Sequence, residues 1–137
     1  MRASALLAFV VAAPAWAAGV APADQDAMQQ VITRQMEAFQ RDDDAQAFGF
    51  ASPALQEMFG NAGRFMAMVR GGYAPVYRPR SVTFGEAEDV AGVYVQEVGV
   101  VGPDGEPRIA RYTLERQADG TWRISGCQLL ERARPTS

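Results

Sequence analysis

The residues with the clearest chemical potential are three consecutive aspartates, Asp42, Asp43 and Asp44, in the stretch FQRDDDAQAFGFASP. Such a run could bind a metal ion, form a catalytic acid cluster or begin a helix. Neighbouring side chains on a helix point in different directions, and the run lacks the alternating ligands of a calcium loop. An aspartate before a helix accepts hydrogen bonds from the free N–H groups of the first turn. We therefore expect Asp42 or Asp43 to cap a short helix, and the run to be structural.

The chain contains no histidine, and all 13 of its basic residues are arginine. Histidine is the commonest general base near neutral pH and the commonest ligand of transition metals. Catalytic triads and dyads that use histidine are therefore excluded, as are histidine zinc sites. We expect no metal site and no cofactor.

Cys127 is the single cysteine, so it cannot form a disulfide within the chain. It could be a buried small apolar residue, a reactive thiol or one half of an intermolecular bridge. Free cysteine is among the most buried residue types, which favours the first interpretation.

A second group of residues with binding chemistry lies in VRGGYAPVYRPRSV, residues 69–82. Arginine and tyrosine combine a large contact area with directional hydrogen bonds, so they often carry binding energy. The segment could bind an anionic group or a partner protein. It could equally be a connector from a helix to a strand, with packed tyrosines and solvated arginines, and such connectors are common. The candidate surface-binding residues are Arg70, Tyr73, Tyr77, Arg78 and Arg80.

Residues 1–17, MRASALLAFVVAAPAWA, have the pattern of a secretory signal peptide. Arg2 supplies the positive start, an apolar stretch follows, and residues 15–17 form an A-x-A cleavage site. The apolar run is shorter than the roughly 20 residues that a membrane span needs. We expect an exported protein, periplasmic or secreted, with no membrane span after cleavage. The net charge of −3 argues against nucleic acid and anionic membrane surfaces as partners.

The segment after the signal peptide has the spacing of short helices. A helix over 27–41 would place apolar residues on one face. A second helix would carry Phe48 into the core, and a third would begin at Ser52 and Pro53 and end at Gly60. A further helix is expected over 62–70. The apolar face of the first helix consists of Met28, Val31, Ile32, Met36 and Phe39.

The second half of the chain has the pattern of strands joined by tight turns at PDGEP and ADG. Strands are expected over 80–86, 92–101, 108–117 and 121–131. In the last strand the alternation of apolar residues breaks at Gly126. A bulge there would place four residues on the core side, namely Trp122, Ile124, Cys127 and Leu129.

These elements predict an α+β fold in which N-terminal helices pack on a curved antiparallel sheet of about four strands. A length of 137 residues suits one domain. The predicted organisation is a signal peptide (1–17), a linker (18–26), a single α+β domain (27–131) and a flexible tail (132–137).

Three blocks of the sequence resemble a known family: RQMEAFQRDDDAQAFGFASPALQEMFG, FMAMVRGGYAPVYRPRSVTFG and DGTWRISGCQLL. Together they look like a family of exported bacterial proteins known only as a domain of unknown function. That family is similar to the nuclear transport factor 2-like, cystatin-like superfamily. The resemblance implies a cone of helices and curved sheet, and a location in the cell envelope. It implies no reaction, because the superfamily contains isomerases, dehydratases and many non-enzymatic binding domains.

A cone of this kind could admit a small apolar molecule at its mouth. The candidate pocket-lining residues are Tyr94, Tyr112, Trp122 and Cys127. The alternative for the two tyrosines is that they are core aromatics with hydroxyls at an edge. The isomerases of the superfamily use an aspartate and a tyrosine inside the cone, but no motif identifies their equivalents here.

We favour an exported, non-enzymatic module that binds a small apolar ligand or a protein partner. The alternative is a cone-pocket enzyme, similar to the isomerases or dehydratases, that uses a carboxylate and a tyrosine. The exposed face of the sheet could also form a homodimer.

Overall fold

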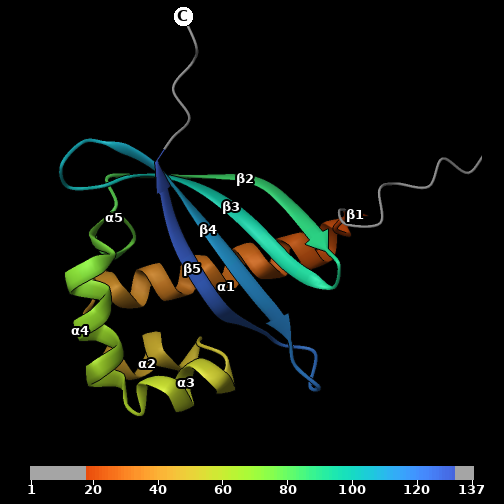
Figure 1. The fold of residues 1–137 in the computed structure, drawn as a ribbon, viewed down its shortest axis with the longest axis horizontal. Coiled ribbons are helices and arrows are strands. Elements are labelled where there is room, and N and C mark those ends of the chain that lie inside the picture. The colour runs from red at the N-terminus through yellow and green to blue at the C-terminus, as the bar shows by residue number, and fades with distance from the viewer. Residues whose placement is uncertain (1–17, 132–137) are drawn as a thin grey trace, which may run out of the picture.

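The structure, a computed structural model, describes residues 18–131. The predicted signal peptide (1–17) and tail (132–137) lie outside the described residues. Helices fill the first half of the chain and strands the second half (Figure 1), so the predicted α+β class is confirmed. The helices are α1 (Pro22–Gln40), α2 (Asp44–Gly49), α3 (Pro53–Phe59), α4 (Ala62–Gly72) and α5 (Ala74–Tyr77). The strands are β1 (Ala18–Gly19), β2 (Ser81–Val90), β3 (Val93–Val101), β4 (Pro107–Arg116) and β5 (Trp122–Glu131).

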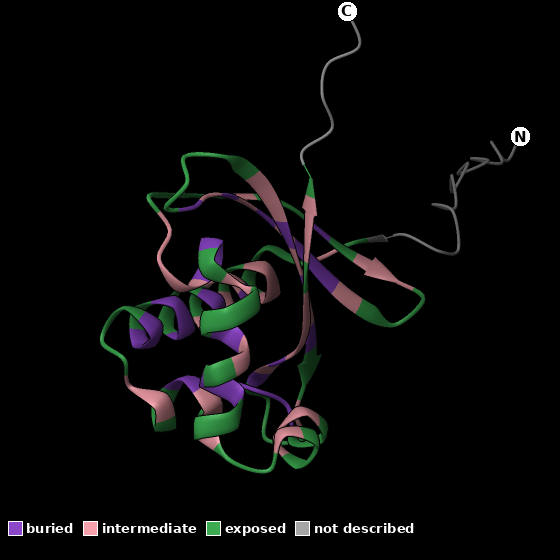
Figure 2. Ribbon diagram, turned by 60° about the vertical axis from the view of Figure 1, so that its left-hand side comes forward, coloured by how far each residue is buried: buried purple, intermediate pink, exposed green. Residues whose placement is uncertain are grey.

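The sheet is antiparallel throughout, in the order β1-β2-β3-β4-β5. Its four long strands are the predicted ones, and the two-residue β1 adds a short edge beside β2. The long helix α1 crosses one face of the sheet, whereas α2, α3 and α4 gather at one end (Figure 1). Buried side chains of the helices and strands together form the core (Figure 2).

Helix α1 begins at Pro22 rather than at Ala27, so residues 22–26, predicted as part of a linker, are helical. Proline is favoured in the first helical positions, and Asp24 in the first turn complements the positive end of the helix dipole. The predicted apolar face is the buried one. Its buried members are Met28, Ile32, Met36 and Phe39, and Val31 is partly buried.

The helix ends follow the capping signals of the sequence. The side chain of Asp43 accepts a hydrogen bond from the backbone N–H of Gln46 (3.1 Å). The hydroxyl of Ser52 accepts one from the N–H of Leu55 (3.3 Å). Gly60 ends α3 in a left-handed conformation with φ of 83°, which glycine adopts without strain. These three predictions are confirmed.

The predicted bulge in β5 is present. Thr113 pairs with Gly126 and Leu114 pairs with Ile124, so Ser125 is the additional residue. A Cβ atom on Gly126 would lie only 2.8 Å from Thr113 Oγ1, so the close approach of β4 requires glycine at this position. Because of the bulge, all four apolar residues predicted for the core side of β5 pack against the core.

A second bulge, which the sequence analysis did not predict, lies in β2 around Gly85 and Glu86. It is filled by the side chain of Gln96, which is fully buried. The Gln96 amide donates to the backbone carbonyls of Gly85 (3.0 Å) and Glu97 (2.8 Å) and accepts from the Gln29 side chain (3.4 Å). The strand therefore continues past residue 86, where it was predicted to end, as far as Val90.

Candidate functional site

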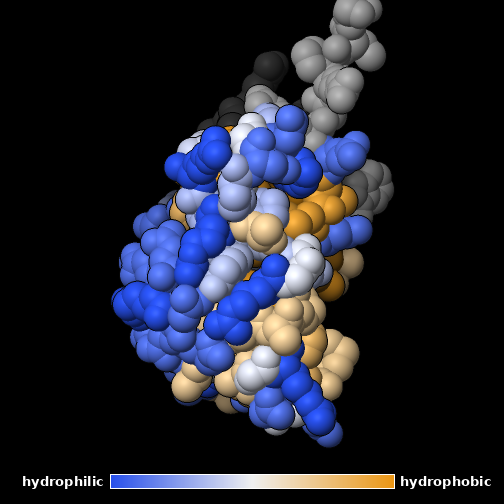
Figure 3. Space-filling model, turned by 90° about the vertical axis from the view of Figure 1, so that its left-hand side faces the viewer, coloured by the Kyte–Doolittle hydropathy of each residue, from blue (hydrophilic) through white to orange (hydrophobic). Residues whose placement is uncertain are grey.

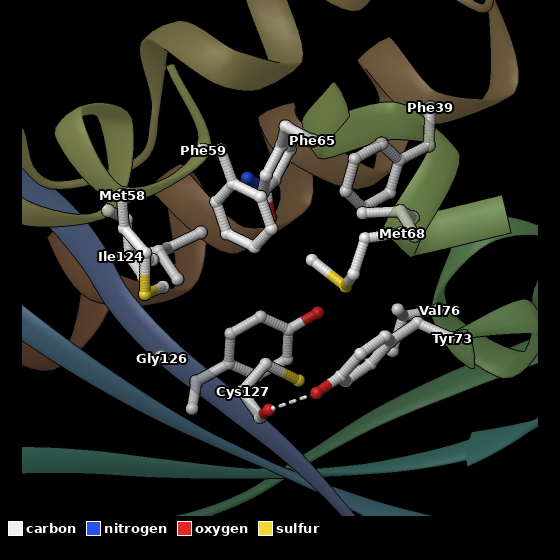
Figure 4. Close-up of a pocket in the computed structure, with 14 residues that line it drawn as sticks. Phe39, Met58, Phe59, Phe65, Met68, Tyr73, Val76, Ile124, Gly126 and Cys127 are labelled. Atoms are coloured by element: carbon white, nitrogen blue, oxygen red, sulfur yellow. Dashed lines mark hydrogen bonds between the residues drawn. The ribbon is translucent and has the colours of Figure 1, made fainter. Parts of the chain in front are cut away.

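A cavity of about 330 Å³ lies between the helices and one end of the sheet (Figure 4). Helices α1, α3, α4 and α5 form one side, and strands β4 and β5 form the floor. Ligand pockets in proteins range from about 300 to 1,000 Å³, so this cavity has the size of a small-molecule site. Most of the residues that line it are apolar, and they include Phe39, Phe59, Phe65 and Met68.

Two neighbouring residues supply polar groups on the sheet floor. Tyr112 on β4 pairs directly with Cys127 on β5, so both side chains lie on the same face of the sheet. The bulge at Gly126 turns Cys127 towards this face. The register of two strands and one bulge therefore brings the tyrosine and the thiol together.

The hydroxyl of Tyr112 is buried, and among the described residues it has no hydrogen-bond partner stronger than the neighbouring Cys127 thiol. The residue is 1% exposed, and its oxygen is the one such buried side-chain atom among the described residues. Most buried polar groups are hydrogen-bonded, and buried tyrosine hydroxyls usually have a partner. Burial raises the pKa of Tyr112 well above its ordinary value and raises the pKa of Cys127 to about 12. Both groups are therefore protonated and uncharged at neutral pH.

Tyr73, predicted as a surface-binding residue, belongs instead to the cavity. It follows α4, lines the cavity and donates a hydrogen bond from its hydroxyl to the backbone carbonyl of Cys127 (3.0 Å; Figure 4). Burial raises the pKa of the Tyr73 hydroxyl. This contact ties the end of α4 to β5 and occupies the carbonyl group nearest the thiol.

The cavity opens beside α3. This helix has no buried residue, and Met58, which lines the cavity, is 68% exposed. Leu55 and Phe59 on the same helix also line the cavity and are partly buried. Methionine is flexible and polarizable, so Met58 is suited to a mouth that contacts molecules of different shape.

Tyr94 and Trp122, the other two candidate pocket residues, do not line the cavity. Their rings pack edge to face with centroids 4.8 Å apart, and the guanidinium of Arg116 lies 5.6 Å from the Trp122 ring centre. They therefore form an aromatic cluster of the core outside the cavity, whereas Tyr112 and Cys127 lie in its wall.

The acidic run and the arginine- and tyrosine-rich segment contact each other. The Asp42 cluster consists of Asp42, Asp44, Arg70, Tyr77 and Arg78. Arg70 Nη2 lies 3.0 Å from Asp44 Oδ1 and 3.4 Å from Asp42 Oδ1, and Arg78 Nη2 lies 3.0 Å from Asp42 Oδ2. The hydroxyl of Tyr77 donates to Asp42, and the Arg78 guanidinium lies 4.0 Å from the Tyr77 ring centre. These side chains are partly exposed. The side of the molecule on which α4 lies carries both hydrophilic and hydrophobic surface (Figure 3).

The Asp42 cluster changes the interpretation of the arginine- and tyrosine-rich segment. Arg70 and Arg78 are paired with aspartates of the same chain, and Arg80 donates to the carbonyl of Pro103 (2.6 Å). Four residues of the predicted connector form the short helix α5, and its first residues belong to α4. Asp42 has a φ of 51°, a left-handed conformation that aspartate tolerates better than most residues. The cluster fastens the turn after α1 to α4 and α5.

We expect the carboxyl group of Asp42 to titrate below the usual aspartate pKa of about 3.9. The hydrogen bond from Tyr77 is the largest cause of the lowered pKa, and Arg70 and Arg78 add to it. A lowered folded-state pKa contributes stability above the unfolded-state pKa, and this contribution is lost as pH falls through the folded-state value. Carboxyl ¹³C NMR should show a higher pKa for Asp42 in the Tyr77→Phe variant. An unchanged pKa would contradict this account of the cluster.

No described helix is both long and apolar enough to cross a membrane. Within residues 18–131, no group of three or more histidine, cysteine, aspartate or glutamate side chains could hold a metal ion. No aspartate or glutamate of the described chain lines the cavity.

Comparison with known proteins gives a family but no individual relative. The family described as a domain of unknown function (DUF4864) matches residues 21–137, which is most of the chain. No curated protein and no solved structure matches the chain. On the extent of this match, the chain belongs to the DUF4864 family.

Proposed function

We propose that the protein is an exported, non-enzymatic module that binds a small, mainly apolar molecule in the cavity beside α3. The observation that carries the proposal is the Tyr112 hydroxyl, which is buried on the wall of an otherwise largely apolar cavity and, among the described residues, has no hydrogen-bond partner stronger than the Cys127 thiol. Leaving a buried polar group unpaired costs about 1–3 kcal/mol, so a ligand that pairs with it gains affinity.

The lining supports this proposal. Apolar and aromatic side chains bury the body of a ligand, and a few polar groups orient it. Here the phenylalanines and methionines of the helices face a floor that carries Tyr112 and Cys127. The open mouth beside α3 gives access without rearrangement of the sheet.

Export is the part of the proposal that the first 17 residues support, because they combine Arg2, an apolar stretch and an A-x-A site. The raised pKa of Cys127 is compatible with an oxidising compartment, since the thiolate is the reactive form and the thiol is not. The packing of helices on one face of an antiparallel sheet is compatible with a nuclear transport factor 2-like cone.

The alternative is a cone-pocket enzyme that uses a carboxylate and a tyrosine. Such an enzyme needs a carboxylate in the cavity near Tyr112 to move a proton. Of the groups that line the cavity, the one that could take the place of a carboxylate base is the Cys127 thiol. Its pKa of about 12 makes it a poor base and nucleophile at neutral pH. The geometry therefore favours binding over catalysis.

A fluorescence titration with N-phenyl-1-naphthylamine, an uncharged apolar probe, tests the proposed function. We expect saturable binding of one probe per chain. Cys127→Phe, which fills the cavity from the floor, and Met68→Trp, which fills it from α4, should each weaken binding by about tenfold or more, because little space would remain. Val93→Phe is the matched control, since Val93 is half exposed and lies outside the cavity.

Circular dichroism and thermal unfolding establish that each variant is folded. Equal binding by the wild-type protein and both filled variants would exclude the cavity as the site. Absence of saturable binding by the wild-type protein would contradict the proposed function.

A further inference from the structure

We infer that the ligand is an uncharged molecule with an apolar ring system and one carbonyl-type oxygen, and that Tyr112 selects it by donating a hydrogen bond to that oxygen. This inference rests on the proposed function and adds the chemical class of the ligand. It follows from three features of the cavity. These are the hydrogen-bond donors on the sheet floor, the lack of charged side chains among the described residues of the lining, and the aromatic rings opposite the floor.

The polar side chains on the sheet floor are hydrogen-bond donors. The Tyr112 hydroxyl has no oxygen or nitrogen acceptor among the described residues, and the sulfur of Cys127 beside it is a weak acceptor. Beside it, the Cys127 side chain is a neutral thiol, which is a weak donor. The backbone carbonyl of Cys127 receives a hydrogen bond from the hydroxyl of Tyr73. A ligand oxygen that accepts a hydrogen bond therefore complements this floor, and an alkyl group does not.

The lining excludes a charged ligand on energetic grounds. No arginine, aspartate or glutamate among the described residues lines the cavity, and Tyr112 and Cys127 are both neutral. Transferring an ion from water into such surroundings without a partner of opposite charge is costly. The arginines Arg70 and Arg78 are held by Asp42 and Asp44 outside the cavity. A carboxylate should therefore bind much more weakly than a neutral molecule of the same shape.

The wall opposite the floor is aromatic. The ring centroids of Phe65 and Phe59 are 5.5 Å apart in an edge-to-face arrangement, and those of Phe65 and Phe39 are 6.4 Å apart. In Figure 4 these three rings lie on the side of the cavity opposite Cys127 and Tyr73. Aromatic rings favour edge-to-face and offset contacts with one another. A ligand ring can therefore pack against them while its oxygen points to Tyr112.

Three probes of nearly equal shape test the inference by displacement of N-phenyl-1-naphthylamine. They are 2-acetylnaphthalene, 2-isopropenylnaphthalene, in which a methylene group replaces the ketone oxygen, and 2-naphthoate. We expect the wild-type protein to bind the ketone about tenfold more tightly than the alkene, the worth of one buried hydrogen bond. The carboxylate should bind the most weakly of the three.

The Tyr112→Phe variant removes the hydroxyl and keeps the ring. It should bind the ketone and the alkene with nearly equal affinity, while the affinity for the alkene stays within about twofold of the wild type. Tyr94→Phe is the matched control, because it also removes a tyrosine hydroxyl. Tyr94 lies on the same, helix-covered face of the sheet as Tyr112, but it does not line the cavity. The control variant should keep the tenfold preference.

Equal affinities for the ketone and the alkene in the wild-type protein would overturn the inference, as would a preference that persists in Tyr112→Phe. Binding of N-phenyl-1-naphthylamine that none of the three probes displaces would also overturn it. In each of these cases the proposed function stands if Cys127→Phe still blocks N-phenyl-1-naphthylamine. If the wild-type protein binds neither that probe nor the ketone, the proposed function fails as well.

Discussion

Replacing Gln96 with glutamate is expected to lower the free energy of unfolding by roughly 3–5 kcal/mol at neutral pH, because two buried hydrogen bonds are lost and a charge is buried. Gln96 is fully buried, and its amide donates to the carbonyl of Gly85 at the β2 bulge and to the carbonyl of its β3 neighbour Glu97. Glutamate has nearly the same shape, but its carboxylate cannot donate, so its oxygens would face carbonyl oxygens. Urea unfolding of the wild-type and variant proteins at pH 7 measures this loss.

The loss of unfolding free energy in Gln96→Glu should be smaller at pH 4 than at pH 7. Burial would raise the folded-state pKa of the new carboxyl group above its unfolded value of about 4.3. The penalty is therefore absent below the unfolded-state pKa and grows as pH rises towards the folded-state value. Gln29→Glu is the matched control, because the Gln29 side chain contacts Gln96 at 3.4 Å but donates to none of the bulge carbonyls. A loss in Gln96→Glu no larger than that of the control would contradict the role of Gln96.

Replacing Phe65 with alanine is expected to lower the free energy of unfolding by about 3–5 kcal/mol, the usual cost of removing a buried phenylalanine. The Phe65 ring is 5% exposed and lies within 6.4 Å of the rings of Phe39, Phe48 and Phe59. It therefore joins α1, α2, α3 and α4 at one point. Thermal and urea unfolding measure the change.

Phe48→Ala provides the comparison for Phe65→Ala. Phe48 is only partly buried and pairs with the Phe65 ring alone among the described aromatic side chains. We expect it to cost about half as much, since less apolar area leaves the core. If both variants lost the same stability, Phe65 would not be the centre of the helical layer.

Features set by local chemistry were predictable from the sequence. The Asp43 and Ser52 caps, the left-handed Gly60 and the bulge at Gly126 depend on neighbouring residues, and the structure contains all four. The early start of α1 also has a local signal in the sequence. Pro22 followed by Asp24 is typical of a first helical turn.

Features set by long-range contacts were not predictable. The Asp42 cluster joins residues that are 26 to 36 positions apart, and nothing in either segment shows that the other lies beside it. The alternation of β3 and β4 places both Tyr94 and Tyr112 on the helix side of the sheet. Only the position of α3 and α4 over one end of the sheet determines that Tyr112 lines a cavity whereas Tyr94 packs on Trp122.

The central claim is that the cavity beside α3 binds a small apolar molecule, and the methionine methyl groups can test it directly. Met58 and Met68 line the cavity, whereas Met28 and Met36 are buried in the core outside it. With ¹³C-methyl-labelled methionine, addition of 2-acetylnaphthalene should shift the NMR signals of Met58 and Met68 in a saturable manner. The signals of Met28 and Met36 should change little. Saturable binding that leaves Met58 and Met68 unmoved would contradict the account.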